Sequence, residues 1–272
     1  MTEDQIKISV VTPAFNSAQY IEQCILSLKN QKYKNFEHII VDGGSTDGTI
    51  EILKKYEHEY PMRWISEPDQ GMYDAIDKGF RIADGEIFAW INSDDFYFPW
   101  TLYVVEKVFE KRGIHWLTGI PAAVKVFGGT EIIYQMPNLP TVFNQKMIEK
   151  GIYDGQRMYF IQQESCFWTR ELWEKSGGIN INYKMAGDYH LWKEFAKFEA
   201  LYTVHCNLAS FRIHKGQKSE DAEKYYSEIG ERKLIGTANK LMMIYLHIYS
   251  LINYRKYVIN LDEIFGTVKE VF

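Results

Sequence analysis

The stretch Phe88-Ala89-Trp90-Ile91-Asn92-Ser93-Asp94-Asp95-Phe96 begins as a short apolar run and then stops on four polar residues. An apolar run of this length is typical of a buried parallel strand. In an open α/β sheet, ligands bind at the carboxyl ends of the strands. Burying two adjacent ionised carboxylates is costly unless a cation or hydrogen bonds compensate their charge. Asp94 and Asp95 therefore indicate a site for a hard divalent cation that holds a phosphate, although a turn that caps the next helix explains the same residues.

The segments before this stretch have the same organisation, since each predicted strand runs into a polar loop and then a helical pattern. Strands are predicted at residues 6–12, 36–41, 62–66 and 86–91. Alternation of strands and helices implies a parallel sheet. Three strands in succession end in acidic loops, at Asp42, at Asp69 and at Asp94/Asp95. An acidic cluster that faces an anionic ligand needs a metal ion between them.

Two positions in these loops have both a functional and a plain structural interpretation. A carboxylate at the strand end, such as Asp42, can accept the N–H of a uracil or guanine ring or a ribose hydroxyl. The following Gly43 and Gly44 let a ligand approach the backbone, yet a capped strand-to-helix corner needs the same residues. Lys78, in a helix predicted at residues 72–82, either reaches nucleotide phosphates or is simply solvated. The chain has no P-loop and no GxGxxG motif.

The second half of the chain is less regular. A hairpin is predicted at residues 124–127 and 132–134, and a strand at residues 162–168. Because Asp is a preferred N-cap residue, the local sequence alone predicts that Asp188 caps an amphipathic helix. The last predicted strand, residues 208–211, leads into a basic, glycine-containing loop that can close over a diphosphate. His214 in this loop is either a metal ligand or an ordinary polar residue.

The composition excludes some classes of function. The net charge of −5 leaves no basic excess for a nucleic acid backbone, so no nucleic acid partner is expected. Three cysteines far apart, without a CxxC pair, predict a reducing compartment and no structural zinc. The N-terminus lacks the pattern of a signal peptide, and the apolar stretch at residues 241–252 is too short to span a bilayer. We therefore expect a cytoplasmic protein.

The region from residue 222 to 272 is helical in pattern. Its apolar residues, among them Leu246 and Leu251, are followed by Tyr254-Arg255-Lys256-Tyr257. Aromatic residues beside basic ones suit a helix that lies at the inner face of a membrane. A helix that packs on the catalytic domain or on a second copy in a homodimer explains the same pattern, and both alternatives stay open.

Taken together, these segments resemble the inverting glycosyltransferases of family 2. The resemblance covers roughly residues 6–219, in the family's order. It rests on VVTPAFN at 10–16, VDGGSTDGT at 41–49, EPDQGMYDAIDKG at 67–79, DGEIFAWINSDD at 84–95, GDYHLW at 187–192 and FRIHKGQKS at 211–219.

The resemblance implies a fold and a division of the chain. The expected fold is the GT-A type, an α/β, Rossmann-like fold with a mixed, mostly parallel central sheet flanked by helices. The catalytic domain would span residues 1–219, with a nucleotide-sugar-binding half at about 1–118 and an acceptor-binding half at about 119–219. Residues 220–272 would form a helical C-terminal extension.

The resemblance also assigns roles to residues. It implies that a nucleotide-diphospho-sugar, most often a UDP-sugar, is held by Pro13, Phe15, Asp42, Asp69, Lys78 and Asp94. It implies a Mn²⁺ or Mg²⁺ ion bound by Asp95 and His214, with Asp188 as the general base. Many members have Asp where this chain has Gly43 and Asn92, which leaves the division of roles between Asp94 and Asp95 open.

The implied reaction is a single in-line displacement with inversion at the anomeric carbon, onto a hydroxyl of a glycan or lipid-linked glycan. The family builds bacterial polysaccharides, O-antigens and capsules. Two other classes of protein are weighed against it. One is a non-catalytic nucleotide-sugar-binding or scaffold protein with a degenerate site. The other is a nucleotidyltransferase, which should carry a glycine-rich basic loop where this chain has Thr-Pro-Ala-Phe-Asn.

Overall fold

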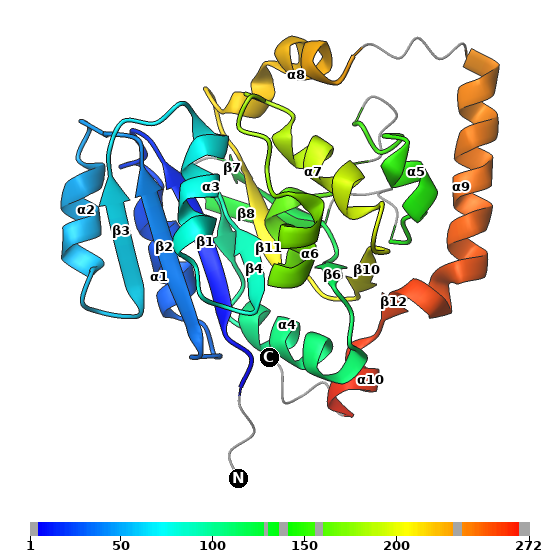
Figure 1. Cartoon of the computed structure of the whole chain (residues 1–272), viewed down its shortest axis with the longest axis horizontal. Coiled ribbons are helices and arrows are strands. Elements are labelled where there is room, and N and C mark those ends of the chain that lie inside the picture. Colours follow the sequence, from blue (N-terminus) through cyan, green and yellow to red (C-terminus); the bar gives the residue numbers. More distant parts are fainter. Residues whose placement is uncertain (1–4, 128–129, 136–140, 156–159, 231–235, 267–272) are drawn as a thin grey trace.

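A large sheet forms the centre of the protein in the computed structural model, which describes residues 5–127, 130–135, 141–155, 160–230 and 236–266 (Figure 1). Within these residues the sheet has eight strands, and only β9 runs antiparallel to its neighbours. The predicted α/β fold with a mixed, mostly parallel sheet is therefore confirmed. The strands follow in the order β12 (Val258–Ile259), β10 (Tyr202–Val204), β6 (Trp116–Thr118), β9 (Phe167–Thr169), β4 (Ile87–Trp90), β1 (Ile8–Ala14), β2 (Phe36–Asp42) and β3 (Met62–Ser66).

The strand β1 lies inside the large sheet, and all seven of its residues are buried. It pairs in parallel with β2 on one side and with β4 on the other. The register places Ala14 beside Asp42 and Val11 beside Trp90. The loops that follow these three strands therefore leave the same edge of the sheet, where a ligand site is expected.

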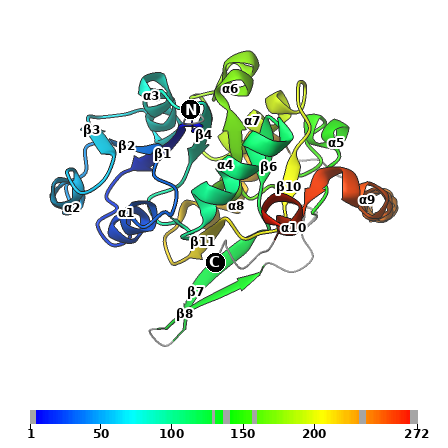
Figure 2. The same ribbon diagram turned by 90° about the horizontal axis from the view of Figure 1, so that it is seen from below.

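Helices cover both faces of the sheet, as Figure 2 shows. Because successive side chains of a strand point to opposite faces, Val11 packs with one layer of helices and Val10 with the other. The first layer contains α3 (Met72–Ile82), α6 (Arg170–Ser176) and α7 (Gly187–Phe195). The second contains α1 (Ile21–Lys29), α4 (Thr101–Arg112) and α10 (Leu261–Phe265), and α2 (Thr49–Tyr56) packs beside α1.

Aromatic side chains fill the core under the first layer. Trp90 and Trp192 stack with ring centroids 5.9 Å apart, and Trp168 meets both rings edge-on. Such contacts add to the stabilisation from burying large apolar area. Much of the high aromatic content of the chain therefore serves the core.

A second, four-stranded sheet connects two distant parts of the chain. β11 pairs with β5 on one side and with β7 on the other, and β8 pairs with β7. The hairpin predicted at residues 124–127 and 132–134 is confirmed as β7 and β8, while its turn lies outside the described residues. The strands are β5 (Phe96–Tyr97), β11 (Ala209–Ile213), β7 (Ala122–Phe127) and β8 (Thr130–Gln135).

Two expectations about the second half need correction. The strand predicted at residues 162–168 is wrong, since a 3₁₀ turn η1 (Gln163–Ser165) precedes the shorter β9. The C-terminal region is helical in α8 (Ala222–Ile229), α9 (Gly236–Tyr257) and α10, but it also adds β12 to the large sheet. Helical periodicity could not predict so short a strand, because partners elsewhere in the chain stabilise it.

Two short helical elements lie in the second half of the chain. A short helix, α5 (Gln145–Glu149), packs on α7, and a 3₁₀ turn η2 (Lys218–Glu220) follows β11. The three cysteines are buried and free. In the part of the chain that the structure describes, no helix has both the length and the apolar character needed to cross a bilayer.

Candidate active site

A cavity of about 1250 Å³ opens at the edge of the sheet where β1, β2 and β4 end. Residues from both halves of the predicted catalytic domain line it, together with residues of α8. Six of the nine site residues predicted from the sequence lie on its wall, namely Pro13, Phe15, Asp69, Asp94, Asp188 and His214. The other three, Asp42, Lys78 and Asp95, do not line it.

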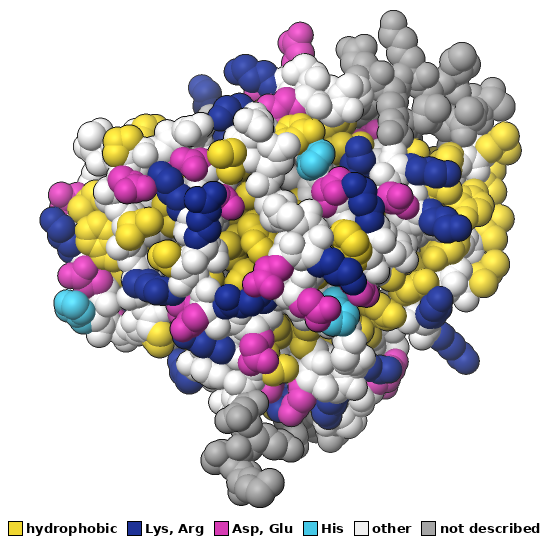
Figure 3. All heavy atoms as spheres, viewed as in Figure 1, with side chains coloured by type: hydrophobic (Ala, Val, Ile, Leu, Met, Phe, Trp, Pro, Cys, Tyr) yellow, Lys and Arg dark blue, Asp and Glu magenta, His cyan; other side chains and the backbone are white. Residues whose placement is uncertain are grey.

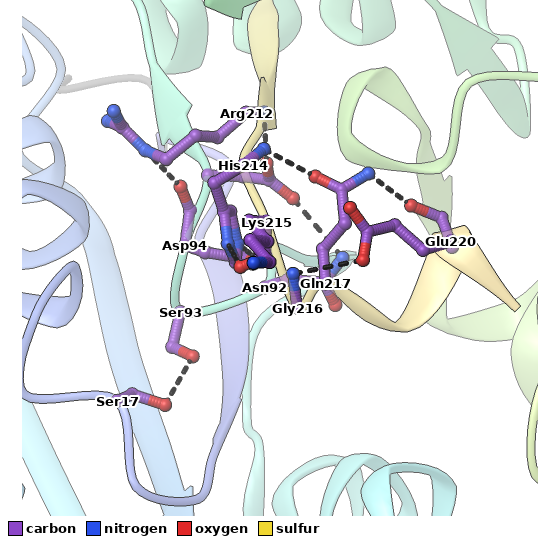
Figure 4. A network of polar contacts seen from close by, with 12 residues as sticks. Ser17, Asn92, Ser93, Asp94, Arg212, His214, Lys215, Gly216, Gln217 and Glu220 are labelled. Atoms are coloured by element: carbon purple, nitrogen blue, oxygen red, sulfur yellow. Dashed lines mark hydrogen bonds and ion pairs between the residues drawn. The ribbon is translucent and has the colours of Figure 1, made fainter. Parts of the chain in front are cut away.

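Asp94 and His214 form a pair on one wall of the cavity (Figure 4). Oδ2 of Asp94 and Nε2 of His214 lie 2.9 Å apart, and the imidazole also rests against the ring of Tyr20 at 4.5 Å between centroids. Pairing of β11 with β5 makes this contact, because Asp94 lies just before β5 and His214 just after β11. The pair presents to the cavity one oxygen and one nitrogen atom of the kind that coordinate metal ions.

Asp95 lies beneath this pair and is almost fully buried. Its Oδ1 accepts a hydrogen bond from the backbone N–H of Arg212 at 2.7 Å, and Oδ2 accepts one from Nδ2 of Asn92 at 3.2 Å. Burial raises the pKa of Asp95 well above its usual range, and the negative charges of Glu164 and Asp94 act in the same direction. In this arrangement Asp95 fastens β11 to the loop of Asp94, and Asp94 is the carboxylate that faces the cavity.

Arg212 holds the loop of Asp94 and the end of β11 in place. Its buried guanidinium donates from Nε to the carbonyl oxygen of Asp94 at 2.8 Å and forms an ion pair with Glu131 at 2.5 Å. The group also lies over the rings of Tyr20 and Phe96. This residue was not predicted from the sequence. An arginine next to a basic loop is expected to be exposed to solvent, and only the fold shows that it is buried.

The loop after β11 carries positive charge to the cavity. The backbone N–H of His214 donates to Oε1 of Gln217 at 2.7 Å, and that of Gly216 donates to Oε2 of Glu220 at 3.0 Å. These bonds give the loop a defined shape (Figure 4), and Lys215 and Lys218 line the cavity beside it. Two lysines at a wall that also holds an acid and a histidine suit a phosphate-bearing ligand.

Asp188 lies on the cavity wall, in the first turn of α7. The expectation that it caps this helix is wrong, because α7 begins at Gly187 and its N-cap is Ala186. Oδ1 of Asp188 is buried and has no hydrogen-bond partner among the described residues. Burial raises the pKa of Asp188 to about 6. A carboxylate with an unused oxygen and a pKa near neutrality is suited to accept a proton.

Gly187 explains how Asp188 reaches this position. A Cβ atom at residue 187 would stand 2.7 Å from the ring of Tyr73, so only glycine fits. Tyr73 itself is buried and donates a hydrogen bond to the carbonyl oxygen of Met185 at 2.9 Å. On the other side of the helix start, Glu228 of α8 accepts hydrogen bonds from three successive backbone N–H groups, those of residues 184–186. The start of α7 is thus fixed from both sides.

Glu164 is a second buried carboxylate on the wall that sequence reasoning missed. Burial raises its pKa to about 7, and the negative charges of Asp188 and Asp94 also raise it. Its turn is fastened by Gln163, whose Nε2 donates to the carbonyl oxygen of Trp90 at 2.7 Å. A strand was expected here, and an isolated glutamate within an expected strand gives no signal of a cavity position.

Asp69 and Phe15 form part of the cavity wall together with Gly43. Oδ1 of Asp69 accepts a hydrogen bond from the N–H of Gly71 at 2.7 Å, while Oδ2 occupies the space that a side chain at residue 43 would need. A Cβ atom there would stand 2.7 Å from that oxygen and 3.3 Å from the ring of Phe15. Phe15 is 63% exposed, so its ring is free to stack on a planar ligand.

Asp42 and Lys78 are engaged elsewhere. The buried carboxylate of Asp42 accepts hydrogen bonds from the N–H groups of Gly44 and Ser45, at 3.0 and 2.9 Å, and so shapes the turn of Gly43. Lys78 forms ion pairs with Glu67 at 2.9 Å and Asp74 at 3.3 Å. Contact of either residue with a nucleotide stays a prediction.

The chain is similar to known proteins in both sequence and fold. The sequence profile described as "Glycosyl transferase family 2" matches residues 9–171. An uncharacterized glycosyltransferase of Nostoc sp. is 26% identical over 227 residues, which cover 82% of this chain and 70% of that protein. A counterpart in Rickettsia typhi is 27% identical over 224 residues, covering 79% of this chain and 66% of its own length. A PGL/p-HBAD biosynthesis glycosyltransferase of Mycobacterium bovis is 26% identical over 226 residues, covering 80% and 81%.

Solved structures with the same fold include two nucleotide-sugar complexes. S. aureus TarS 1-349 in complex with UDP-GlcNAc superposes with a TM-score of 0.66 at 18% identity, covering 86% of this chain and 69% of that one. The mannosyltransferase PcManGT from Pyrobaculum calidifontis, in complex with GDP-Man and Mn²⁺, gives 0.60 at 17% identity, covering 90% and 69%. At these identities the likeness shows the fold alone.

Proposed function

Because the chain belongs to glycosyl transferase family 2, we propose that it transfers a sugar from a nucleotide-diphospho-sugar to a hydroxyl group of a glycan or lipid-linked glycan. We take the donor to be a UDP-sugar and the reaction to be a single displacement that inverts the anomeric carbon. Support for a nucleotide-sugar donor comes from the fold, since TarS was solved with UDP-GlcNAc and PcManGT with GDP-Man.

One observation carries the proposal. The same cavity presents Asp188, with its unused buried oxygen, and the Asp94–His214 pair with the two lysines of the following loop. A proton acceptor and a site for a charged leaving group are the two elements that a displacement at a diphospho-sugar needs. A protein that only bound the nucleotide would have no use for a proton acceptor in the cavity wall.

The nucleotide would lie along the ends of β1 and β3. Phe15 would stack on the base, and Pro13 would line the same wall. Asp69 would contact the nucleotide through Oδ2, the carboxylate oxygen next to Gly43. Asp42 would act through the turn that it shapes, which keeps Gly43 close to the ligand.

A divalent cation, Mn²⁺ or Mg²⁺, fits the donors at this site. Among the described residues no group of three or more His, Cys, Asp or Glu side chains is arranged around one point. Asp94 and His214 supply two donors 2.9 Å apart on the cavity wall. Mg²⁺ in particular is often bound by one or two carboxylates together with substrate phosphates, so two protein donors suffice. The cation would neutralise charge on the diphosphate. The sequence led us to expect Asp95 and His214 as its ligands, but Asp95 is buried and does not line the cavity. We therefore assign the cation to Asp94 and His214, with Asp95 supporting their loops from below.

Different residues of the chain then serve different steps of the proposed reaction. Asp188 accepts the proton of the acceptor hydroxyl as its oxygen forms a bond to the anomeric carbon. The bond from that carbon to the diphosphate oxygen breaks, and the negative charge that develops there lies near Lys215 and Lys218. Half-buried aromatic side chains on the remaining wall, Tyr225 and Tyr226, provide flat surfaces for the acceptor sugar.

The proposal is tested by thermal shift with UDP, GDP, dTDP and CMP, each with and without Mn²⁺. Stabilisation by one nucleotide that requires the metal and is lost in Asp94→Ala supports the site. The exposed residue Glu51 on α2 gives a matched control, Glu51→Ala, which should respond like the wild type. Stabilisation followed by release of free sugar or transfer from the corresponding donor identifies an enzyme. If no nucleotide stabilises the protein, the proposal fails, and if one does but no donor is ever turned over, the non-catalytic alternative is correct.

A further inference from the structure

The helix α9 lies at one side of the molecule, and only one of its faces meets the rest of the chain (Figures 1 and 2). Of the twelve large apolar side chains that are exposed in the described residues, six belong to α9, with 45–76% of their surface exposed. They recur at intervals of three or four residues and therefore share one face of the helix. We call this the outer face of α9: Leu241, Ile244, Tyr245, Ile248, Leu251 and Ile252.

The opposite, inner face already accounts for the attachment of the helix. Leu246 and Tyr257 are buried, and Met242 packs against the same core cluster as Leu246. That cluster includes Phe143 and Tyr153.

Tyr245, at the border of the two faces, accepts a hydrogen bond from Nδ2 of Asn144 at 3.3 Å. Because the inner face and this bond attach α9, the five aliphatic residues of the outer face are not needed to hold the helix in place. Exposed apolar surface of this kind marks a site of interaction.

The charge of α9 indicates what it meets. The segment 236–257 contains three basic residues and no acidic residue, in a chain whose net charge is −5. Arg255 and Lys256 are exposed in the last turn. Figure 3 shows hydrophobic side chains along the edge where α9 lies, with Lys and Arg side chains near its lower end. An apolar face bordered by basic residues is complementary to an anionic lipid surface.

We propose that the outer face of α9 docks on an anionic membrane surface, with the helix lying in the plane of the headgroups. The 22 residues of α9 extend over about 33 Å at a rise of 1.5 Å per residue, so the five aliphatic side chains of the outer face can insert side by side. The basic residues of the last turn would then face the lipid phosphates.

A second copy of the chain is a poorer occupant. Contact of two outer faces around a two-fold axis brings the same segment of each copy together. Since this segment has only basic charges, the two helices have no acidic side chains to pair with them, and like charges across an interface are unfavourable.

The position of α9 connects the docking surface with the cavity. Leu246 on its inner face belongs to the same core cluster as Tyr153, and Tyr153 lines the cavity. This cluster therefore connects the inner face of α9 with the wall that we assign to the acceptor. This link to a lipid-linked acceptor rests on the proposed function, whereas docking itself does not and is measured without donor or acceptor.

Vesicle flotation tests the docking. The full chain is mixed with vesicles of phosphatidylcholine alone or of phosphatidylcholine with phosphatidylglycerol. We expect flotation with the anionic vesicles only, and weaker binding at high salt. Replacement of both basic residues, Arg255→Gln with Lys256→Gln, should weaken binding about thirtyfold. The pair Ile248→Glu with Leu251→Glu should abolish it.

A matched control comes from the exposed edge strand β8. Ile132→Glu with Ile133→Glu changes two side chains that are about half exposed, far from α9 in sequence, and should leave flotation unchanged. Melting temperatures and nucleotide-dependent stabilisation of all variants report on folding. The proposal is overturned if the wild type does not float with anionic vesicles, or if the α9 variants float as well as the control. The proposal is also overturned if the protein is a dimer in solution and the variant Ile248→Glu with Leu251→Glu is a monomer. The outer face of α9 would then bind a second copy of the chain.

Discussion

Nε2 of His214 lies 2.9 Å from Oδ2 of Asp94, although 120 residues separate them in the chain. The antiparallel pairing of β11 with β5 brings them together, and the guanidinium of Arg212 fixes both loops. The loop after a short strand in the second half of the chain therefore completes a site that begins after β4. This contact adds a loop of the second half of the chain to the cavity wall that carries Asp94, where we propose that the diphosphate and its cation bind.

The first prediction concerns this pair. Replacement of His214 by alanine should weaken metal-dependent nucleotide binding at least about tenfold, or 1.4 kcal/mol, because the cation loses one of two protein donors. Titration calorimetry with UDP in the presence and absence of Mn²⁺ measures the effect. His58→Ala is the control, since that side chain is 91% exposed at the end of α2. Equal metal dependence in wild type and His214→Ala would show that the imidazole is not a ligand.

The second prediction separates binding from transfer. Asp188→Asn keeps the shape of the cavity but removes the proton acceptor, so transfer should fall by about 10²- to 10⁴-fold. Nucleotide affinity should stay at the wild-type value, because Asp188 does not contact the leaving group in the proposed arrangement. Turnover at the wild-type rate would reduce Asp188 to a structural residue of the first turn of α7.

The pH dependence of transfer gives a third prediction. The pKa of Asp188 is raised by burial to about 6, and only the ionised form accepts a proton. The rate should therefore rise as the pH increases toward about 6 and become constant above it. The residual rate of Asp188→Asn should lack this step when both proteins are measured at saturating donor and metal. A step that persists in the variant would assign the titration to another group.

The order of elements could be predicted from the sequence, because it depends on local patterns. Short runs rich in apolar residues identified β1, β2, β3 and β4 with small errors at their ends, and acidic loops follow the last three of them. The same loops indicated which edge of the sheet holds the site. Parallel strands leave that edge together whatever their register, so Asp69 and Asp94 could be placed there without a structure.

The side-chain roles could not be predicted in the same way. Asp94 and Asp95 are adjacent, and only the packing of β11 decides that Asp94 faces the cavity while Asp95 is buried against Arg212. Glu164 lies in a 3₁₀ turn that depends on Gln163 reaching the backbone of Trp90. These contacts join residues far apart in the chain, and no local pattern encodes them.

A fourth prediction follows from the close approach of Gly43 and Asp69. Gly43→Ala places a Cβ atom 2.7 Å from Oδ2 of Asp69, and the flexible carboxylate should swing away instead of unfolding the turn. We expect nucleotide affinity to fall about as much as in Asp69→Ala, with little change in the melting temperature. The double variant should bind no more weakly than either single one, because both act through the same carboxylate. Additive losses in a double-mutant cycle would contradict this relationship.

The last prediction concerns Glu164 and the pH dependence of stability. Burial raises its pKa from 4.5 to about 7 in the folded protein. Between these values the folded state keeps a proton that the unfolded state releases, so its contribution to stability is present below pH 4.5 and is lost as the pH rises through 7. Glu164→Gln has no charge to bury, and its free energy of unfolding should exceed that of the wild type at pH 8 by about 1–3 kcal/mol. At pH 4.5 the free energies of unfolding of the two proteins should be nearly equal.

Urea unfolding at both pH values measures the difference, with the exposed Glu149→Gln on α5 as the control. If Glu164→Gln is no more stable than the wild type at pH 8, the ionised carboxylate of Glu164 does not destabilise the folded protein. If the variant is more stable but transfers sugar more slowly, the cavity keeps this carboxylate for its function.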